Sequence, residues 1–452
     1  MEFQDSQFSF IHDTAQEFLA AFHIANLKHD IVSQLKTKNQ QYVLEMSQTV
    51  IYLFGLDCEK ANKLINRLIN AHFLNDISHR QSVYIKKFYN QEHLLSCQTE
   101  TDIMGNVVKS KHDDQRDYNA RCLELSVLFQ RMIIAGCIEA EVSGQTEMCL
   151  QCRDFTFYDY LNYMDSKALK TLLMLNKSDV RSLILERNVL QTSEILIVLQ
   201  HSTVSLKRVK TTVTPEINKA LQQTSIEELH CIGKIDVPSL SLVLPSLSYL
   251  TYLHIEESTF KDKIVLPDTV KHFSLFTCTC NSVFLQRLLL HLSSFKHDVQ
   301  CDLRLVSATD CNTHLFESEI LASDMSNITL SVKQGNTELY GLLRCTSIGK
   351  LALLTDDDVA LASNILSTLS KIKQLYLHGT FMNLCYLSLP AAVQCVSLPQ
   401  VVCTYEWLCS LLITLSSLDH HVQCELWDVE LSSYDEACGE IPIQKNLTCD
   451  LK

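Results

Sequence analysis

The pair Cys149-x-x-Cys152 is the arrangement in this sequence that comes nearest to a metal site. Structural zinc needs four converging thiolate or imidazole ligands. No second C-x-x-C and no H-x₃₋₅-H partner lies at finger spacing, so we predict packing thiols and no metal. Cys301 and Cys424 stand at the same place in two related segments, LSSFKHDVQCDL and LSSLDHHVQCEL, which also favours a packing role.

Two charged clusters could bind ions. The run 356–358 is Asp-Asp-Asp and follows a strand pattern, but it lacks the EF-hand spacing and its glycine, so we predict a solvated loop. Lys207, Arg208 and Lys210 form the densest basic cluster of the C-terminal part. An anion contact remains open for it, and charge protection of an exposed strand edge is the interpretation that we favour. No pattern pairs a nucleophile with a base, so we expect no enzyme.

Composition narrows the class of protein. The 452 residues include 46% hydrophobic residues, 10 glycines and 7 prolines, which favours a packed chain over a disordered one. The formal net charge of −14 disfavours binding to nucleic acid or to anionic membranes, since both select basic surfaces. The sequence shows neither a signal-peptide pattern nor an apolar run of about 18 residues. With 19 cysteines, it predicts a soluble cytoplasmic protein whose thiols are reduced.

The first 160 residues have the apolar spacing of amphipathic helices. We expect helices at 12–27, 42–56, 59–73 and 118–141, and a polar surface loop at 98–118.

From about residue 180, short β-type runs alternate with short helical runs. VRSLILERNVL, LTYLHIEESTF and IKQLYLHGTFM fit the pattern L-x-x-L-x-L-x-x-N-x-L of a leucine-rich repeat. Strands are expected to begin near 180, 204, 226, 250, 270, 299, 328, 348, 372, 393 and 422. The consensus asparagine is mostly replaced, by Ser258 and Cys278 among others, so the repeats are divergent.

Segments 202–303 and 326–426 look like a tandem duplication, because matching motifs recur with a shift of 122 to 124 residues throughout. In such repeats the leucines point inward, and the residues between them line a concave sheet. Helices starting at Ser282 and Glu406 would form the convex side. His254 and His378, offset by 124, are near-equivalent in this scheme. The residues predicted to bind a ligand or partner on the concave face are Glu228, His230, Tyr252, His254, Glu256, Gln374, Tyr376 and His378.

The segment FSFIHDTAQEFLAAFHIANL, residues 8–27, resembles a motif of NLR proteins, the NACHT–leucine-rich-repeat innate immune sensors. Nine residues match F-x-F-x-H-x-x-x-Q-E-F-L-A-A, which lies in the winged-helix part of their nucleotide-binding module. VIYLFGLD, residues 50–57, is similar to the next helical segment, with one residue missing before Gly55. LQCRDFTFYDYLNYMDSKAL, residues 150–169, resembles the junction where the repeats begin.

The resemblance implies that His12 hydrogen-bonds a phosphate of ADP, as the motif histidine does in the inactive state of NLR proteins. None of the glycines belongs to a G-x-x-x-x-G-K-[ST] loop, so we expect no bound cofactor in this chain alone. ADP or ATP would bind only with an upstream NACHT module, and His12 would then act as a phosphate contact. Packing or capping at the start of the helix is the alternative role for His12.

The predicted fold class is α/β, with an all-helical N-terminal region followed by a curved, divergent leucine-rich-repeat solenoid. The predicted domains are a winged-helix remnant at 1–30, a helical domain at 31–170 and the repeats at 171–452. The predicted function is a non-enzymatic, ligand-sensing and autoinhibitory region of an NLR-like receptor, binding a protein or microbial ligand on the concave face. The alternative is a stand-alone leucine-rich-repeat scaffold or decoy that has lost the nucleotide-binding module.

Overall fold

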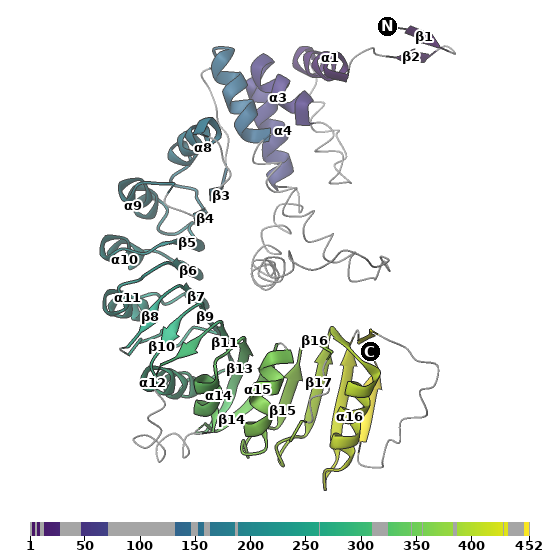
Figure 1. Ribbon diagram of the computed structural model, residues 1–452. Coiled ribbons are helices and arrows are strands. Elements are labelled where there is room, and N and C mark those ends of the chain that lie inside the picture. The colour runs from purple at the N-terminus through teal and green to yellow at the C-terminus, as the bar shows by residue number, and fades with distance from the viewer. Residues whose placement is uncertain are drawn as a thin grey trace. The chain divides into compact units, whose positions relative to one another are not determined.

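The computed structural model describes residues 2–4, 7–9, 13–27, 47–70, 132–145, 152–157, 163–185, 189–261, 263–309, 324–344, 346–354, 356–382, 387–427, 429–432 and 447–451. The chain divides into two compact units (Figure 1). The first comprises Met1–Arg153 and Tyr160–Asn176, and the second comprises Asp154–Asp159 and Lys177–Lys452. The predicted loop at 98–118 lies outside the described residues.

The first unit is mainly helical. Its helices are α1 (Asp13–Asn26), α3 (Ser47–Leu56), α4 (Cys58–Asn70), a helix at 132–142 and α8 (Tyr163–Leu175). The region that we expected to be entirely helical also contains an antiparallel hairpin, β1 (Glu2–Gln4) and β2 (Gln7–Ser9), directly before α1.

Close packing joins the helices of the first unit. The helix at 132–142 approaches α3 at Gly136, where a Cβ would overlap the buried ring of Phe54. Lys60 on α4 donates hydrogen bonds to the carbonyl oxygens of Ala25 and Leu27 at the C-terminal end of α1. A cation at that end also complements the helix dipole, so α4 is anchored to the last turn of α1.

The second unit is built on a parallel sheet of 13 strands whose order in space follows their order in the chain. The strands are β3 (Asp154–Phe157), β4 (Ser182–Leu185), β5 (Arg208–Thr212), β6 (Glu228–Ile232), β7 (Tyr252–Glu256), β9 (His272–Phe276), β11 (Val299–Arg304), β13 (Met325–Lys333), β14 (Ile348–Leu353), β15 (Gln374–Leu377), β17 (Cys395–Pro399), β19 (Val422–Trp427) and β21 (Leu447–Leu451). Each predicted strand start lies within four residues of an observed one, the largest difference being 204 against Arg208.

Short helices connect many of these strands. They are α9 (Thr192–His201), α10 (Pro215–Leu221), α11 (Val237–Val243), α12 (Ser282–Ser293), α14 (Thr337–Leu343), α15 (Asp356–Leu366) and α16 (Tyr405–Ser416), with a 3₁₀ turn at Leu244–Ser246. α9 to α12 lie along one side of the strands (Figure 1). Alternate strand residues such as Leu229, Leu253 and Phe273 are fully buried in the core. Two consecutive parallel strands can be joined only by a connection that crosses back over the sheet, and here the helices make this connection. Each strand with its inward leucines and the helix that follows it therefore form one repeating unit.

Two smaller parallel sheets have matching places in the two predicted copies. One contains β8 (Thr259–Phe260), β10 (Thr279–Cys280) and β12 (Ser307–Ala308), and the other contains β16 (Gly379–Phe381), β18 (Val401–Cys403) and β20 (Glu430–Leu431).

Side-chain contacts recur at offsets of 121 to 123 residues. Phe260 stacks on Phe284 with ring centroids 4.5 Å apart, and Phe381 stacks on Trp407 at 4.6 Å. Asn281 caps α12, and 123 residues later Thr404 caps α16. The recurrence of both packing and capping is consistent with a duplicated block.

Left-handed residues end several strands of the large sheet. Glu257, Thr277, Leu305, Gln334 and Gln400 have φ of 52° to 54°. The backbone N–H of the first three, and of Gln400, donates to the carbonyl of the last residue of the next strand along the sheet. The turn therefore repeats as a hydrogen-bonded ladder, which offsets the cost of positive φ in residues other than glycine.

Candidate binding site on the large sheet

The strand register brings polar residues from distant parts of the sequence into rows on the face opposite the leucines. The central row contains Lys210, His230, His254, Ser274 and Asp302, one from each of five adjacent strands. Neighbouring rows add Tyr252, His272, Glu256, Phe276 and Arg304. We call these residues of β5 to β11 the polar face: Lys210, His230, Tyr252, His254, Glu256, His272, Ser274, Phe276, Asp302 and Arg304.

Stacked rings cross the polar face. Tyr252 lies between His230 and His272, with ring centroids 5.0 and 4.7 Å away. His254 lies 5.3 Å from His230 and 6.3 Å from Phe276. Rings at these separations make favourable contacts that also hold each other in place, so this part of the face is preorganised.

Carboxylates and imidazoles form pairs next to the rings. Nε2 of His254 lies 3.0 Å from Oε1 of Glu256, and Nε2 of His272 lies 2.9 Å from Oδ2 of Asp302. Burial lowers the pKa of His254 although the Glu256 carboxylate opposes the shift. The His254 contact is therefore a hydrogen bond from a neutral imidazole to a carboxylate, rather than an ion pair at neutral pH.

The polar face is more buried than a solvent-exposed concave surface would be. His230, Tyr252, His254 and Glu256 all have exposed fractions of 8% or less, whereas Glu228 is half-buried. Rings and charged groups on adjacent strands cover one another. A ligand on this face would therefore contact the edges of ordered rings and a fixed pattern of charges, rather than side chains that are free to move.

The predicted site residues in the second copy are more accessible. Gln374, Tyr376 and His378 are half-buried, and the hydroxyl of Tyr376 donates to Oε1 of Gln374 over 3.1 Å. The strand register makes Tyr376 the counterpart of His254, because Ala352 pairs with Tyr376 where His230 pairs with His254. The predicted equivalence of His254 and His378 is therefore wrong by two residues, one full side-chain period of a strand.

The basic cluster does not protect a sheet edge. β5 pairs with β4 on one side and β6 on the other, and Arg208 and Lys210 are buried. Our prediction of an exposed strand edge was wrong because an isolated sequence does not reveal how many strands flank a given one. Burial lowers the pKa of Lys210 to about 8, and the charge of Glu256 opposes this only in part.

The acidic run 356–358 is not a solvated loop. It begins α15, and the side chain of Asp358 is fully buried. Its carboxylate accepts hydrogen bonds from the backbone N–H groups of Gln334 and Gly335, at 3.0 and 3.2 Å, and from the hydroxyl of Tyr340. The Asp358 carboxylate thus accepts the hydrogen bond from the N–H of Gln334, whereas at the other left-handed turns a backbone carbonyl at the end of the next strand is the acceptor.

Two substitutes for the consensus asparagine still bond across repeats. The hydroxyl of Ser258 donates to the carbonyl of Gly233 over 2.8 Å, and the thiol of Cys278 lies 3.5 Å from the carbonyl oxygen of Ile255. The ladder expected from the consensus asparagine is therefore retained at these turns with weaker donors.

Most of the described cysteines are buried, as packing thiols are, whereas Cys395, Cys409 and Cys449 are half-buried. Burial raises the pKa of Cys137 to about 12, and the neighbouring Cys152 and Cys58 add to the shift. A buried protonated thiol is a poor nucleophile and a poor metal ligand. Among the described residues, no three His, Cys, Asp or Glu side chains are grouped to hold a metal ion. Cys149 and His12 lie outside the described residues.

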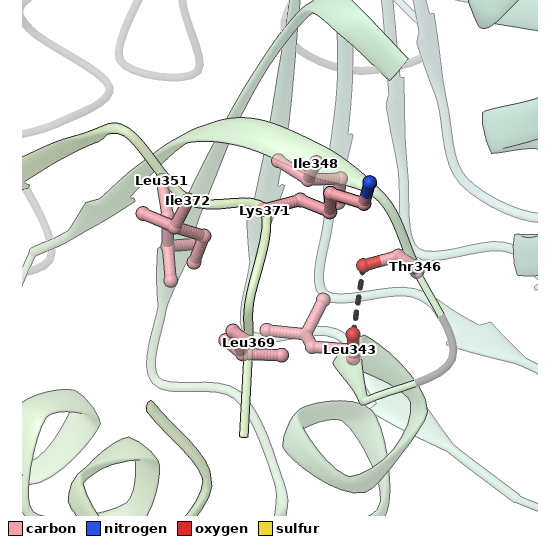
Figure 2. A pocket seen from close by; sticks show the side chains of 7 residues that line it. All are labelled: Leu343, Thr346, Ile348, Leu351, Leu369, Lys371 and Ile372. Atoms are coloured by element: carbon pink, nitrogen blue, oxygen red, sulfur yellow. Dashed lines mark hydrogen bonds between the residues drawn. The ribbon is translucent and has the colours of Figure 1, made fainter. Parts of the chain in front are cut away.

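A small pocket opens between α14 and β14 in the second copy. Figure 2 shows its lining, which is mostly aliphatic, with one polar contact from the Thr346 hydroxyl to the carbonyl of Leu343 at 2.7 Å. Lys371 lies at its edge, where the first copy has Tyr249, 122 residues earlier. The mostly aliphatic lining of the pocket offers little recognition chemistry.

Sequence reasoning missed several members of the polar face, namely Lys210, His272, Asp302 and Arg304. The sequence did contain a signal for them, because each lies one or three positions from an inward residue of its strand and must therefore point to the opposite face. It could be used only once the strands had been aligned, because it is the register that places these residues beside Tyr252 and His254.

The polar face makes the stability of the folded protein fall at acid pH. Burial alone would raise the pKa of Asp302, but the His272 hydrogen bond and the charges of His272 and Arg304 lower it to about 2 from its ordinary 3.8. A depressed carboxyl pKa stabilises the folded state above about pH 4, and this stabilisation is lost as the pH falls toward 2. We expect Asp302 to contribute about 2 kcal/mol at neutral pH.

Urea denaturation at several pH values measures this contribution. Asp302→Asn should reduce the loss of stability between pH 4 and pH 2, whereas Asp298→Asn, which alters an exposed carboxylate paired with Lys350, should leave it unchanged. Equal acid sensitivity in wild type and Asp302→Asn would contradict the assignment.

No known protein family and no curated protein matches this sequence. Within the part of the chain that the structure describes, no helix is long and apolar enough to cross a membrane.

Proposed function

We propose that the second unit is a leucine-rich-repeat solenoid that binds a protein partner or microbial ligand on the helix-free face of its large sheet, without catalysis. The single observation that carries this proposal is the 13-stranded parallel sheet in strict chain order, with core leucines on one face and ordered polar and aromatic rows on the other. Tyrosine, tryptophan and arginine are the residues that most often anchor interfaces. Tyr376 and Trp427 are the accessible aromatic residues of this face in the second copy.

We further propose that the chain is the sensing and autoinhibitory part of an NLR-like cytoplasmic receptor. The motif at 8–27 supports this context, as does the hairpin β1–β2 directly before α1. Phe18, Leu19 and Phe22 of the motif helix are 43% to 50% exposed. A capping helix of a stand-alone scaffold would bury such residues, so their exposure favours packing against a further module over the decoy alternative.

Substitution of accessible residues on the proposed binding face tests the function. We expect Gln374→Ala, Tyr376→Ala and His378→Ala, combined in one tagged full-length chain, to lower recovery of specific partners by about tenfold or more. The measurement is quantitative mass spectrometry after crosslinking and purification from cells that express the chain.

The matched control carries Glu216→Ala, Lys219→Ala and Arg287→Ala, which alter exposed residues on the helical side. Partners that depend on the proposed face should be retained by this control. If no protein falls selectively with the first variant, or if both variants lose the same proteins, the proposal is wrong.

A further inference from the structure

We propose that Glu425, between Tyr376 and Trp427 on the helix-free face, binds a cationic side chain, arginine or lysine, of a protein partner. This site gives the chemistry of the partner, so the inference rests on the proposed function. The observation behind it is a comparison between the two copies, because Asp302 stands at the place of Glu425 in the first copy, 123 residues earlier.

The first copy supplies the basic partners of its carboxylate from its own chain. Oδ2 of Asp302 lies 2.9 Å from Nε2 of His272 and 3.5 Å from a terminal nitrogen of Arg304. The amide of Gln300 donates to Oδ1 over 3.1 Å. A buried carboxylate of this kind is stable only when paired, and Asp302 is paired within the protein.

The second copy keeps the uncharged part of this arrangement. The amide of Gln423 donates to Oε1 of Glu425 over 3.2 Å, as Gln300 does to Asp302. The hydroxyl of Ser397 donates to Oε2 over 3.0 Å. A carboxylate has about four acceptor positions, so these two bonds orient Glu425 and leave room for a further donor.

The basic partners are what the second copy lacks. Cys395 and Trp427 stand at the places of His272 and Arg304, again 123 residues later. The substitutions remove both basic side chains and put an accessible aromatic ring where the first copy has its guanidinium group. The carboxylate position is thus common to both copies, and only the first copy fills it with a cation of its own.

Other cations of the second copy do not take this role. Within the described part of the chain, no lysine, arginine or histidine forms an ion pair with Glu425, which is half-buried. Its register partners, Ser397 and Asp450, are not basic residues. Lys350 pairs with Asp298 over 3.1 Å. A cation brought by a partner would therefore meet a partly desolvated carboxylate, where their attraction is stronger than in water.

The flanking aromatic residues also favour a cation. Trp427 is 44% exposed and follows Glu425 by two residues on β19, so both side chains point to the same face. Tyr376 lies in the row of Glu425, with the small Ser397 between them. Burial raises the pKa of Tyr376 and the charge of Glu425 adds to the shift, so the hydroxyl lies within the field of this carboxylate. Ring faces beside a carboxylate attract ammonium and guanidinium groups.

Selection of random peptides displayed on phage, on the immobilised full-length chain, tests the site. Peptides that bind the wild type and are lost on the variant with Gln374→Ala, Tyr376→Ala and His378→Ala define ligands of the face. We expect these peptides to be enriched in arginine or lysine, and Glu425→Gln to lower their recovery about tenfold. Glu406→Gln, which removes an exposed carboxylate on α16, is the matched control and should retain them.

A double-mutant cycle then assigns the contact to one pair of groups. Calorimetry measures Kd for a selected peptide and for the same peptide with its cation replaced by glutamine, on wild type and on Glu425→Gln. We expect each single change to raise Kd about tenfold and the combined change to raise it little further, because both remove the same contact. Trp427→Arg, which restores the arginine of the first copy, should also weaken binding of the cationic peptide.

Circular dichroism identifies the variants that fold, and Trp427→Arg is the second variant if Glu425→Gln does not. Ligands of the face without enrichment in arginine or lysine would overturn this site and leave the proposed function standing. Additive effects in the cycle, or an unchanged Kd for a folded Glu425→Gln, would do the same. If no selected peptide depends on the face, the site and the proposed function both fail.

Discussion

Replacing Asp358 by alanine should destabilise the second unit by about 3–5 kcal/mol. The fully buried carboxylate satisfies the backbone N–H groups of Gln334 and Gly335 and the hydroxyl of Tyr340. Alanine would remove the acceptor from all three donors, of which those of Gly335 and Tyr340 are buried, and would leave the turn at Gln334, held at φ of 53°, without its side-chain hydrogen bonds. Urea denaturation followed by circular dichroism measures the change.

Tyr340→Phe is the control for this prediction, since it removes one donor and leaves both backbone donors paired with the carboxylate. Its expected cost is about 1 kcal/mol. If Asp358→Ala cost no more than Tyr340→Phe, the carboxylate would not be the acceptor that stabilises the turn at Gln334.

Replacing Trp407 by alanine should cost about 3–5 kcal/mol, because a large and almost fully buried ring is removed from the core of the second copy. Trp407 stacks on Phe381 at 4.6 Å, so its loss leaves a cavity beside a ring that cannot move into it easily. Thermal and urea unfolding followed by circular dichroism are suitable measurements, because the substitution changes the tryptophan fluorescence itself.

Trp407→Phe should be far milder, with a cost below about 1.5 kcal/mol. The first copy already has Phe284 in this place, stacked on Phe260 at 4.5 Å. The indole Nε1 of Trp407 has no hydrogen-bond acceptor within the described part of the chain, so phenylalanine would lose no such bond. Similar costs for the alanine and phenylalanine variants would show that the two copies are not packed equivalently.

The positions of the large-sheet strands from β4 to β19 could be predicted from the sequence because they follow from local periodicity, whereas β3, β21 and the strands of the two small sheets were not predicted. Inward leucines such as Leu253 and Leu375 recur at alternate positions within each strand and at intervals of about 20 to 29 residues between strands. The helices α12 and α16 were predicted for the same reason, since their apolar residues recur at helical spacing. The hairpin β1–β2 was not predicted, because three-residue strands are too short to show a period.

The role of Asp358 could not be predicted, because three consecutive aspartates resemble a surface loop in the absence of a partner. Its acceptor role depends on a turn 24 residues earlier in the sequence. Arg208 and Lys210 were misassigned for a similar reason, since the flanking strands β4 and β6 bury them. These contacts join residues that are far apart in the sequence, and they arise because the strands stack side by side. No short sequence window contains both partners.

The sequence by itself determined which residues alternate between the core and the opposite face, because a strand has a period of two and the leucines mark its inward side. Only the tertiary structure decided which polar residues lie beside one another. The pairing of β11 with β13 sets Arg304 opposite Lys333, and the pairing of β7 with β9 sets Tyr252 beside His272. Register between strands is fixed by packing and backbone hydrogen bonds over the whole sheet, and these contacts act across distances that local spacing does not encode.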